Sequence, residues 1–188
     1  FKDNKWDGKQ IYWYENGQIE SESNYSKGVQ QGKWICWHEN GQIASQVNYK
    51  NGVEDGCYSY WSENGQKWTE DNYKNGIEHG KHTTWHENGQ KSLEYNYKDG
   101  KKDGKWSTWH ENGQIASQVN YKNGVEDGCY SYWHENGQKA SGLIEWSQKE
   151  LNFSNKRNLI NAVVTDWYED GSIKQETHYK NNEKHGTF

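Results

Sequence analysis

The chain contains no proline and no methionine, and Arg157 is its only arginine. Proline lacks the N–H group that a central β-strand donates to its neighbour, so a proline-free chain is compatible with a nearly continuous sheet. Only 30% of the 188 residues are hydrophobic, which is too few for a conventional layered core. No apolar run is long enough to span a membrane, and no signal peptide is visible. Because the initiator methionine is missing, we expect a fragment of a longer array.

The charge of the chain disfavours two classes of partner. The net charge is −5, and there is no polybasic run. A protein that binds duplex DNA presents a basic stripe, and an electrostatic membrane anchor presents clustered lysine and arginine. We therefore expect no nucleic-acid partner and do not expect membrane binding.

The chain repeats itself with a fixed period. Residues 37–61 and 109–133 are the same 25 residues, WHENGQIASQVNYKNGVEDGCYSYW, and the glycine of the E-N-G triplet recurs every 24 residues. A period of this size indicates a repeat architecture, in which each unit is too small to bury its own face and relies on its neighbours. Aromatic residues make up 15% of the chain, so disorder is not expected.

Two Asn-Gly dipeptides in each unit, such as Asn40-Gly41 and Asn51-Gly52, predict two tight hairpin turns of type I′. Two-residue turns would pair Glu39 with Gln42 and Lys50 with Val53, and would leave a stagger of ~6.6 Å per unit. The predicted fold is all-β: an elongated single-layer antiparallel meander of tandem 24-residue hairpins, forming a twisted, coiled ribbon. We expect one array over residues 1–188, with regular repeats at 8–146, an insertion loop at 147–161 and a last repeat at 162–188.

Alternation along the strands then assigns side chains to two faces. One face is expected to carry Trp34, Cys36, His38, Ile43, Ser45, Val47 and Tyr49. The other is expected to carry the tryptophan series that includes Trp37, with Ala44, Trp68 and Ala116 filling the gaps between its rings. Each regular unit also places a glycine opposite a tyrosine, as Gly32 opposite Tyr49, where the ring covers the strand glycine. The insertion, by contrast, is locally basic, and its Leu151, Leu159 and Ile160 suit a short helix that packs on the sheet.

The unit Y-x-N-G-x-x-D-G-x-W-x-x-W-x-E-N-G-Q resembles the MORN repeat, in the bacterial variant found in YwqK-type antitoxin proteins. The resemblance spans nearly the whole chain and is interrupted only by the insertion. It implies an elongated single-layer antiparallel sheet. It also implies a role as an antitoxin or immunity component, a surface lipoprotein or a scaffold, and it supplies no catalytic residues.

Few residues suggest chemistry. The histidines at one turn position, such as His38 and His110, lie at least ~9.6 Å apart across the strands, whereas metal-bound nitrogens lie ~2 Å from zinc. We therefore interpret them as polar residues beside a turn, and we expect no metal site, no cofactor and no catalytic residue. The three cysteines form no C-x-x-C motif and favour a reducing compartment. We expect a cytoplasmic protein, or a cell-surface protein if a leader is missing.

The aromatic stripe is the feature that suggests function, because sheet aromatics bind partners by stacking. These rings also serve as the packing of a one-layer sheet, and both roles are compatible. With the basic part of the insertion, the expected partner-binding residues are Trp34, Tyr58, Tyr60, Trp106, Tyr130, Tyr132, Lys156 and Arg157. The leading hypothesis is a noncatalytic protein-binding module of antitoxin or immunity type, whose partner is a protein such as a toxin. The alternatives are a self-assembling cell-surface scaffold and a membrane-associated MORN module.

Overall fold

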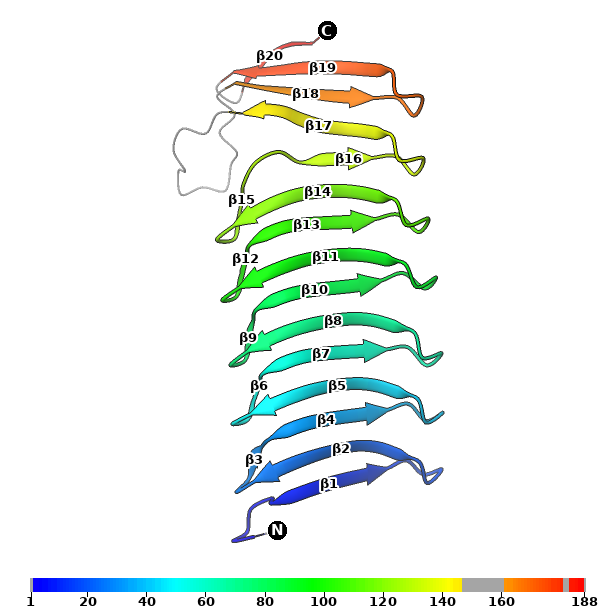
Figure 1. Cartoon of the computed structure of the whole chain (residues 1–188), viewed down its shortest axis with the longest axis vertical. Helices are drawn as coiled ribbons and strands as arrows, with labels where there is room; N and C mark the ends of the chain where they lie inside the picture. Colours follow the sequence, from blue (N-terminus) through cyan, green and yellow to red (C-terminus); the bar gives the residue numbers. More distant parts are fainter. Residues whose placement is uncertain (1, 147–160, 181–182, 188) are drawn as a thin grey trace. The chain divides into compact units, whose positions relative to one another are not determined.

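The computed structural model describes residues 2–146, 161–180 and 183–187, and every regular element within these ranges is a β-strand. No helix that is long and apolar enough to cross a membrane occurs in this part of the chain. The chain divides into two compact units, Phe1–Asp103 and Gly104–Phe188. Each unit is an open antiparallel sheet of consecutive hairpins (Figure 1). The all-β hairpin fold expected from the sequence is therefore confirmed. The proposed helix and Leu151, Leu159 and Ile160 lie outside the described residues.

The first unit is a meander in which each strand pairs with the strands next to it in sequence. Each pair of long strands is followed by a two-residue strand, which continues after one residue into the next long strand, and both of these pair with the same preceding strand. Its strands are β1 (Gly8–Trp13), β2 (Ile19–Ser26), β3 (Val29–Gln30), β4 (Gly32–Trp37), β5 (Ile43–Lys50), β6 (Val53–Glu54), β7 (Gly56–Trp61), β8 (Lys67–Lys74), β9 (Ile77–Glu78), β10 (Gly80–Trp85), β11 (Lys91–Lys98) and β12 (Lys101–Lys102).

The second unit continues the same pattern through the insertion. Ser117 pairs with Tyr132, but Ser141, one repeat later, pairs with Asp166, so the ladder between β17 and β18 resumes after the inserted residues. The strands are β13 (Gly104–Trp109), β14 (Ile115–Lys122), β15 (Val125–Glu126), β16 (Ser131–Trp133), β17 (Lys139–Trp146), β18 (Asn161–Trp167), β19 (Ile173–Lys180) and β20 (Glu183–Thr187).

The turn at Asn51-Gly52 is the type I′ turn that the sequence predicts. Both residues have positive φ, 53° and 81°, as this turn requires. Lys50 pairs with Val53 across it. The same pair of positive φ values recurs at Lys27-Gly28, Asn75-Gly76, Asp99-Gly100 and Asn123-Gly124.

The turn at Asn40-Gly41 is different, and the prediction for it was wrong. Of these two residues only Gly41 has positive φ, 82°. The His38 N–H donates to the Gln42 carbonyl at 2.8 Å and closes the loop. The Gly41 N–H donates to the His38 carbonyl at 2.9 Å. Three residues therefore form the loop, which ends in a left-handed glycine and a bulge. Asn40 instead uses its side chain, because Oδ1 accepts the Gln42 N–H at 2.9 Å.

The predicted stagger between repeats is also absent. Cys36 pairs with Ser45, and Ser45 pairs with Tyr60, so two steps across the sheet advance the chain by the whole 24-residue repeat. The two extra residues are taken up where β6 passes into β7, at Gly56 with φ of 111°. Since a bulge accommodates unpaired residues in one strand, equivalent side chains in successive repeats stand directly across the sheet from one another.

The bulge at the Asn40-Gly41 turn changes the predicted face of the residues that follow the turn. Alternation placed Ile43 with Val47 and Ala44 with the tryptophans, but the register shifts between Cys36 and Trp37, and Trp37 pairs with Ile43. At the position equivalent to Ile43, Lys67 places Nζ 5.3 Å from the Trp61 ring and 5.7 Å from the Trp85 ring. The gaps between tryptophans are thus filled by the Ile43 position. They are not filled by Ala44, Trp68 or Ala116, as the sequence had suggested.

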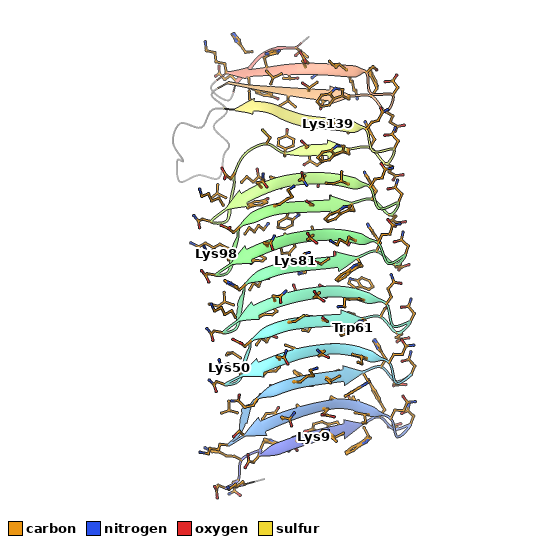
Figure 2. The ribbon with its side chains drawn as sticks, viewed as in Figure 1. Lys9, Lys50, Trp61, Lys81, Lys98 and Lys139 are labelled. Atoms are coloured by element: carbon orange, nitrogen blue, oxygen red, sulfur yellow. The ribbon has the colours of Figure 1, made fainter. Side chains whose placement is uncertain are left out.

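Each face takes its name from the aromatic residue that recurs on it in successive repeats. The tyrosine face carries Tyr49 and its equivalents, each opposite a strand glycine as predicted: Gly8–Tyr25, Gly32–Tyr49, Gly56–Tyr73, Gly80–Tyr97 and Gly104–Tyr121. The tryptophan face carries Trp61 and its equivalents. Figure 2 shows Trp61 toward one end of its strand and Lys50 and Lys98 at the opposite end of theirs. The most buried side chains are small, including Val47, Ser59 and Thr83, so larger rings cover small residues on each face.

Candidate binding surface

Three of the predicted partner-binding residues, Trp34, Tyr58 and Tyr60, lie on the tyrosine face of the first unit. Trp34 packs against Tyr49, with ring centroids 5.9 Å apart. Tyr60 is 36% exposed and meets the imidazole of His38 edge-on at 6.3 Å. Since the rings are fixed by packing yet remain in part open to solvent, they present a rigid aromatic surface.

The second unit holds the other three predicted aromatic residues. Trp106 packs against Tyr121 with ring centroids 5.6 Å apart, which repeats the contact of Trp34 with Tyr49. Tyr130 and Tyr132 meet edge-to-face at 5.5 Å, and Tyr132 is 49% exposed. Lys156 and Arg157, the predicted basic contribution, lie outside the described residues.

Sequence reasoning missed three carboxylates that the register brings onto the tyrosine face of the first unit. Asp71 is the cross-strand neighbour of Tyr58. Glu54 pairs with Tyr49, and Glu78 pairs with Tyr73. Directly opposed residues in an antiparallel ladder have Cβ atoms about 4.5–5.5 Å apart. Each acidic side chain therefore stands beside a tyrosine ring. We call this set, the three carboxylates with Tyr49, Tyr58 and Tyr73, the acidic aromatic surface.

The pKa values of the tyrosine hydroxyls reflect this environment. Burial, followed by the negative charges of Asp71 and Glu54, raises the pKa of Tyr73 to about 12. Burial also raises the pKa of Tyr58, with Asp71 as the next cause. Both effects disfavour the phenolate, since one removes water from the charged form and the other places a like charge nearby. The rings of this surface therefore stay neutral phenols around neutral pH.

Asp71 also forms an ion pair with His82, which follows from the observed register. Asp71 Oδ1 contacts His82 Nδ1, and each side chain is only 15% exposed. The ring of Tyr95 stacks on the imidazole at 4.2 Å, and the Thr69 hydroxyl donates to the other carboxylate oxygen at 3.3 Å. The predicted stagger would have set Asp71 two residues away from His82, so only the corrected register reveals the pair.

The tryptophan face of the first unit differs in its charges, because its acidic residues are paired with lysines. Lys67 binds Glu70 at 2.6 Å, and Glu94 receives both Lys81 at 2.7 Å and Lys91 at 2.6 Å. Acidic and basic side chains on this face therefore compensate one another. The tyrosine face carries Glu54, Asp71 and Glu78 before its first strand lysine, Lys102, which pairs with Tyr97.

A comparison with known protein families finds the MORN repeat variant at six places: residues 6–27, 30–51, 54–75, 78–99, 102–123 and 161–181. These matches cover more than half of the chain. The chain belongs to this family. No curated protein matches it. The resemblance to MORN repeats is thereby confirmed, and the family establishes a repeat module.

Within this MORN array the turn histidines link successive repeats. His38 Nε2 donates to the Trp61 carbonyl at 2.8 Å, and His110 makes the same bond to Trp133. Tyr14 replaces the imidazole with a hydroxyl and reaches the Trp37 carbonyl at 2.7 Å. Within the described part of the chain, no group of three or more His, Cys, Asp or Glu side chains is placed to hold a metal ion.

Proposed function

We propose that this MORN-repeat chain is a noncatalytic protein-binding module and that the acidic aromatic surface of the first unit receives the partner. The observation that carries the proposal is a set of partly exposed rings fixed on paired strands, in which Tyr58 of this surface lies beside Tyr60 on the same face of β7. Tyrosine and tryptophan supply large contact area at a small cost in side-chain entropy, which is why they are enriched where proteins bind one another. The narrower proposal, an antitoxin or immunity role, rests on the resemblance to YwqK-type proteins.

The flatness of a single-layer sheet supports binding to a macromolecule over chemistry on a small substrate. Small-molecule sites are concave and enclose most of the ligand, whereas a specific protein interface needs roughly 600–1,000 Å² from each partner. The rings and carboxylates of β5–β8 lie on consecutive strands of one face, so a partner can contact them together.

The test uses the whole chain, immobilised and exposed to extract from its source cells. The variant Tyr58→Ser with Tyr60→Ser removes two rings from the tyrosine face. The control, Val53→Ser with Ile77→Ser, removes exposed apolar side chains at positions that pair with Lys50 and Lys74 on the opposite face. We expect a protein that is captured by the unaltered chain and by the control, and is lost with the tyrosine variant. Equal recovery by both variants, or no captured protein, would refute the proposal. Sedimentation with vesicles would instead favour a membrane-associated module.

A further inference from the structure

We propose, on the basis of the protein-binding function above, that the acidic aromatic surface takes an extended segment of the partner that carries lysine or arginine side chains. Glu54 and Glu78 would receive the cationic groups, and the tyrosine rings beside them would contact the side-chain stems. This names the chemistry of the partner, which neither the family nor the fold specifies.

Lysines and unpaired glutamates lie on opposite faces of the sheet in this part of the chain. From Gly32 to Lys98 every lysine in a strand lies on the tryptophan face. Lys67, Lys81 and Lys91 bind carboxylates there, and the remaining strand lysines lie at positions that alternate with tyrosine-face residues: Lys33, Lys50, Lys74 and Lys98. Over these strands the tyrosine face therefore carries Glu54 and Glu78 without an intramolecular lysine, whereas Asp71 contacts the imidazole of His82. A basic partner would supply cations to the two glutamates.

The glutamates of this surface stand beside neutral aromatic rings. The face of a tyrosine ring carries negative electrostatic potential and attracts a cation within about 6 Å of its centroid. Glu54 stands opposite Tyr49, and Glu78 stands opposite Tyr73. A lysine or arginine entering beside any of these pairs would meet a ring and a carboxylate together, which selects a basic side chain over a neutral or acidic one.

The spacing of the two glutamates across the sheet suits an extended segment. Glu54 and Glu78 hold the same position in successive repeats, and the repeats have no stagger. Their strand positions are two strands apart, about 9.6 Å. A polyproline II segment rises about 9.3 Å in three residues and returns every third side chain to the same side. A segment of that conformation that crosses the strands with a basic residue at every third position would therefore place one cation at each glutamate.

Within the first unit, carboxylates at the positions of Glu54 and Asp71 on the tyrosine face are confined to this surface. In the repeat before this surface, Gln30 stands where Glu54 does, and Val47 stands where Asp71 does. The aromatic rows continue through that repeat, since Tyr25 and Trp34 hold the positions of Tyr49 and Tyr58. The carboxylates are therefore additions to a common aromatic scaffold, and they distinguish residues 53–78 from the neutral repeat beside them.

The test measures binding of the heptapeptide Lys-Thr-Thr-Lys-Thr-Thr-Lys to the whole chain by calorimetry, with Glu-Thr-Thr-Glu-Thr-Thr-Glu as the comparison peptide. The variant Glu54→Gln with Glu78→Gln removes two charges that form no ion pair among the described residues. The matched control, Glu39→Gln with Glu63→Gln, removes two exposed charges from the Asn-Gly turns at the other end of the strands.

We expect the lysine peptide to bind, the acidic peptide not to bind, and the Glu54/Glu78 variant to bind about three- to tenfold more weakly, while the control is unchanged. Added salt should weaken binding to the unaltered chain more than to the variant, since exposed charges are screened. Equal affinity of all three proteins would overturn the inference. So would a concentration-dependent dimer that disappears in the Glu54/Glu78 variant, because the occupant would then be a second copy.

The two proposals fail in different ways. If the captured cellular protein is lost with Tyr58→Ser/Tyr60→Ser but retained with Glu54→Gln/Glu78→Gln, protein binding stands and the basic segment is wrong. If the lysine peptide binds through the glutamates but no cellular protein is captured, cation recognition stands and the proposed function is wrong.

Discussion

The imidazole Nε2 of His38 lies 2.8 Å from the carbonyl oxygen of Trp61, the equivalent of Trp37 in the next repeat. The hydrogen bond joins one hairpin turn to the following hairpin. At the Asn40 turn a second such link runs in parallel, from Asn40 Nδ2 to the Glu63 carbonyl at 2.6 Å. Successive repeats are therefore held together at the turns by side chains as well as by the backbone ladder.

Loss of the histidine link should destabilise the array. We predict that His38→Ala lowers the free energy of unfolding by about 1 kcal/mol, because the Trp61 carbonyl loses its protein donor. His38→Tyr should restore most of this, since Tyr14 reaches the equivalent carbonyl through its hydroxyl. The urea midpoint, followed by circular dichroism, measures both effects. An unchanged midpoint for His38→Ala would show that the bond contributes nothing.

The glycine at the start of β7 should resist substitution more than its counterpart in β4. Gly56 has φ of 111°, and an added Cβ would lie 3.4 Å from Asn48 Nδ2, whereas Gly32 has φ of 71° and no atom within 4 Å. We predict that Gly56→Ala costs about 1–2 kcal/mol and that Gly32→Ala costs less. Thermal unfolding of the two variants, side by side, tests the order. The reverse order would mean that the bulge relaxes to accept a side chain.

The lysine between two tryptophans offers a test of the corrected face assignment. Lys67 binds Glu70 and lies over both Trp61 and Trp85. We predict that Lys67→Glu lowers stability by about 1–2 kcal/mol, because the new carboxylate meets both Glu70 and the negative faces of the rings. Lys67→Ile, the residue at the equivalent Ile43, should leave stability within about 1 kcal/mol of the original. Equal urea midpoints for the two variants would place this side chain away from the rings.

Tyr73 should make stability fall at alkaline pH. Its pKa is raised from 10.0 to about 12, first by burial and then by Asp71, Glu54 and Glu78. The folded state holds this proton more tightly than the unfolded state, so the contribution is complete below pH 10 and is lost as pH rises through about 12. Tyr73→Phe should therefore flatten the fall in stability over this window.

The same tyrosine can be followed by its phenolate absorbance. Glu54→Gln should lower the titration midpoint of Tyr73, because it removes one of the charges that oppose ionisation. Glu63→Gln, at the remote turn, serves as the control and should leave the titration unchanged. An unchanged titration midpoint in Glu54→Gln would indicate that burial alone raises the pKa of Tyr73.

Much of the fold was predictable from short-range patterns. The 24-residue period, the turn at Asn51-Gly52 and the pairing of Gly32 with Tyr49 were all inferred from the sequence and are present. Each depends on a few adjacent residues or on strict alternation, for which local backbone preference decides the outcome. The aromatic residues of the candidate surface were found in the same way, because Trp34, Tyr58 and Tyr60 share one parity.

The errors have two origins, a bulge at each end of the strands. Asn40-Gly41 and Asn51-Gly52 have the same two letters, but only the second forms a two-residue turn. In the first, the Asn40 side chain accepts the Gln42 N–H and donates to the next repeat, which favours a longer loop with a bulge. That bulge moves Ile43 to the other face of the sheet, and the separate bulge at Gly56 removes the stagger. The pairing of Asp71 with His82 follows only once the equivalent shift between β9 and β10 is known.

The sequence by itself determined that this chain is a series of β-hairpins with aromatic rows, because periodicity and turn residues act over a few neighbouring positions. The tertiary structure decided the register between hairpins, and with it which charges stand beside which rings. Register depends on bulges that lie beside contacts between repeats, such as the bond from the Asn75 N–H to the Asp55 carboxylate at 3.1 Å, next to Gly56. No single repeat contains both partners of such a contact, so the acidic aromatic surface became visible only when the repeats were assembled.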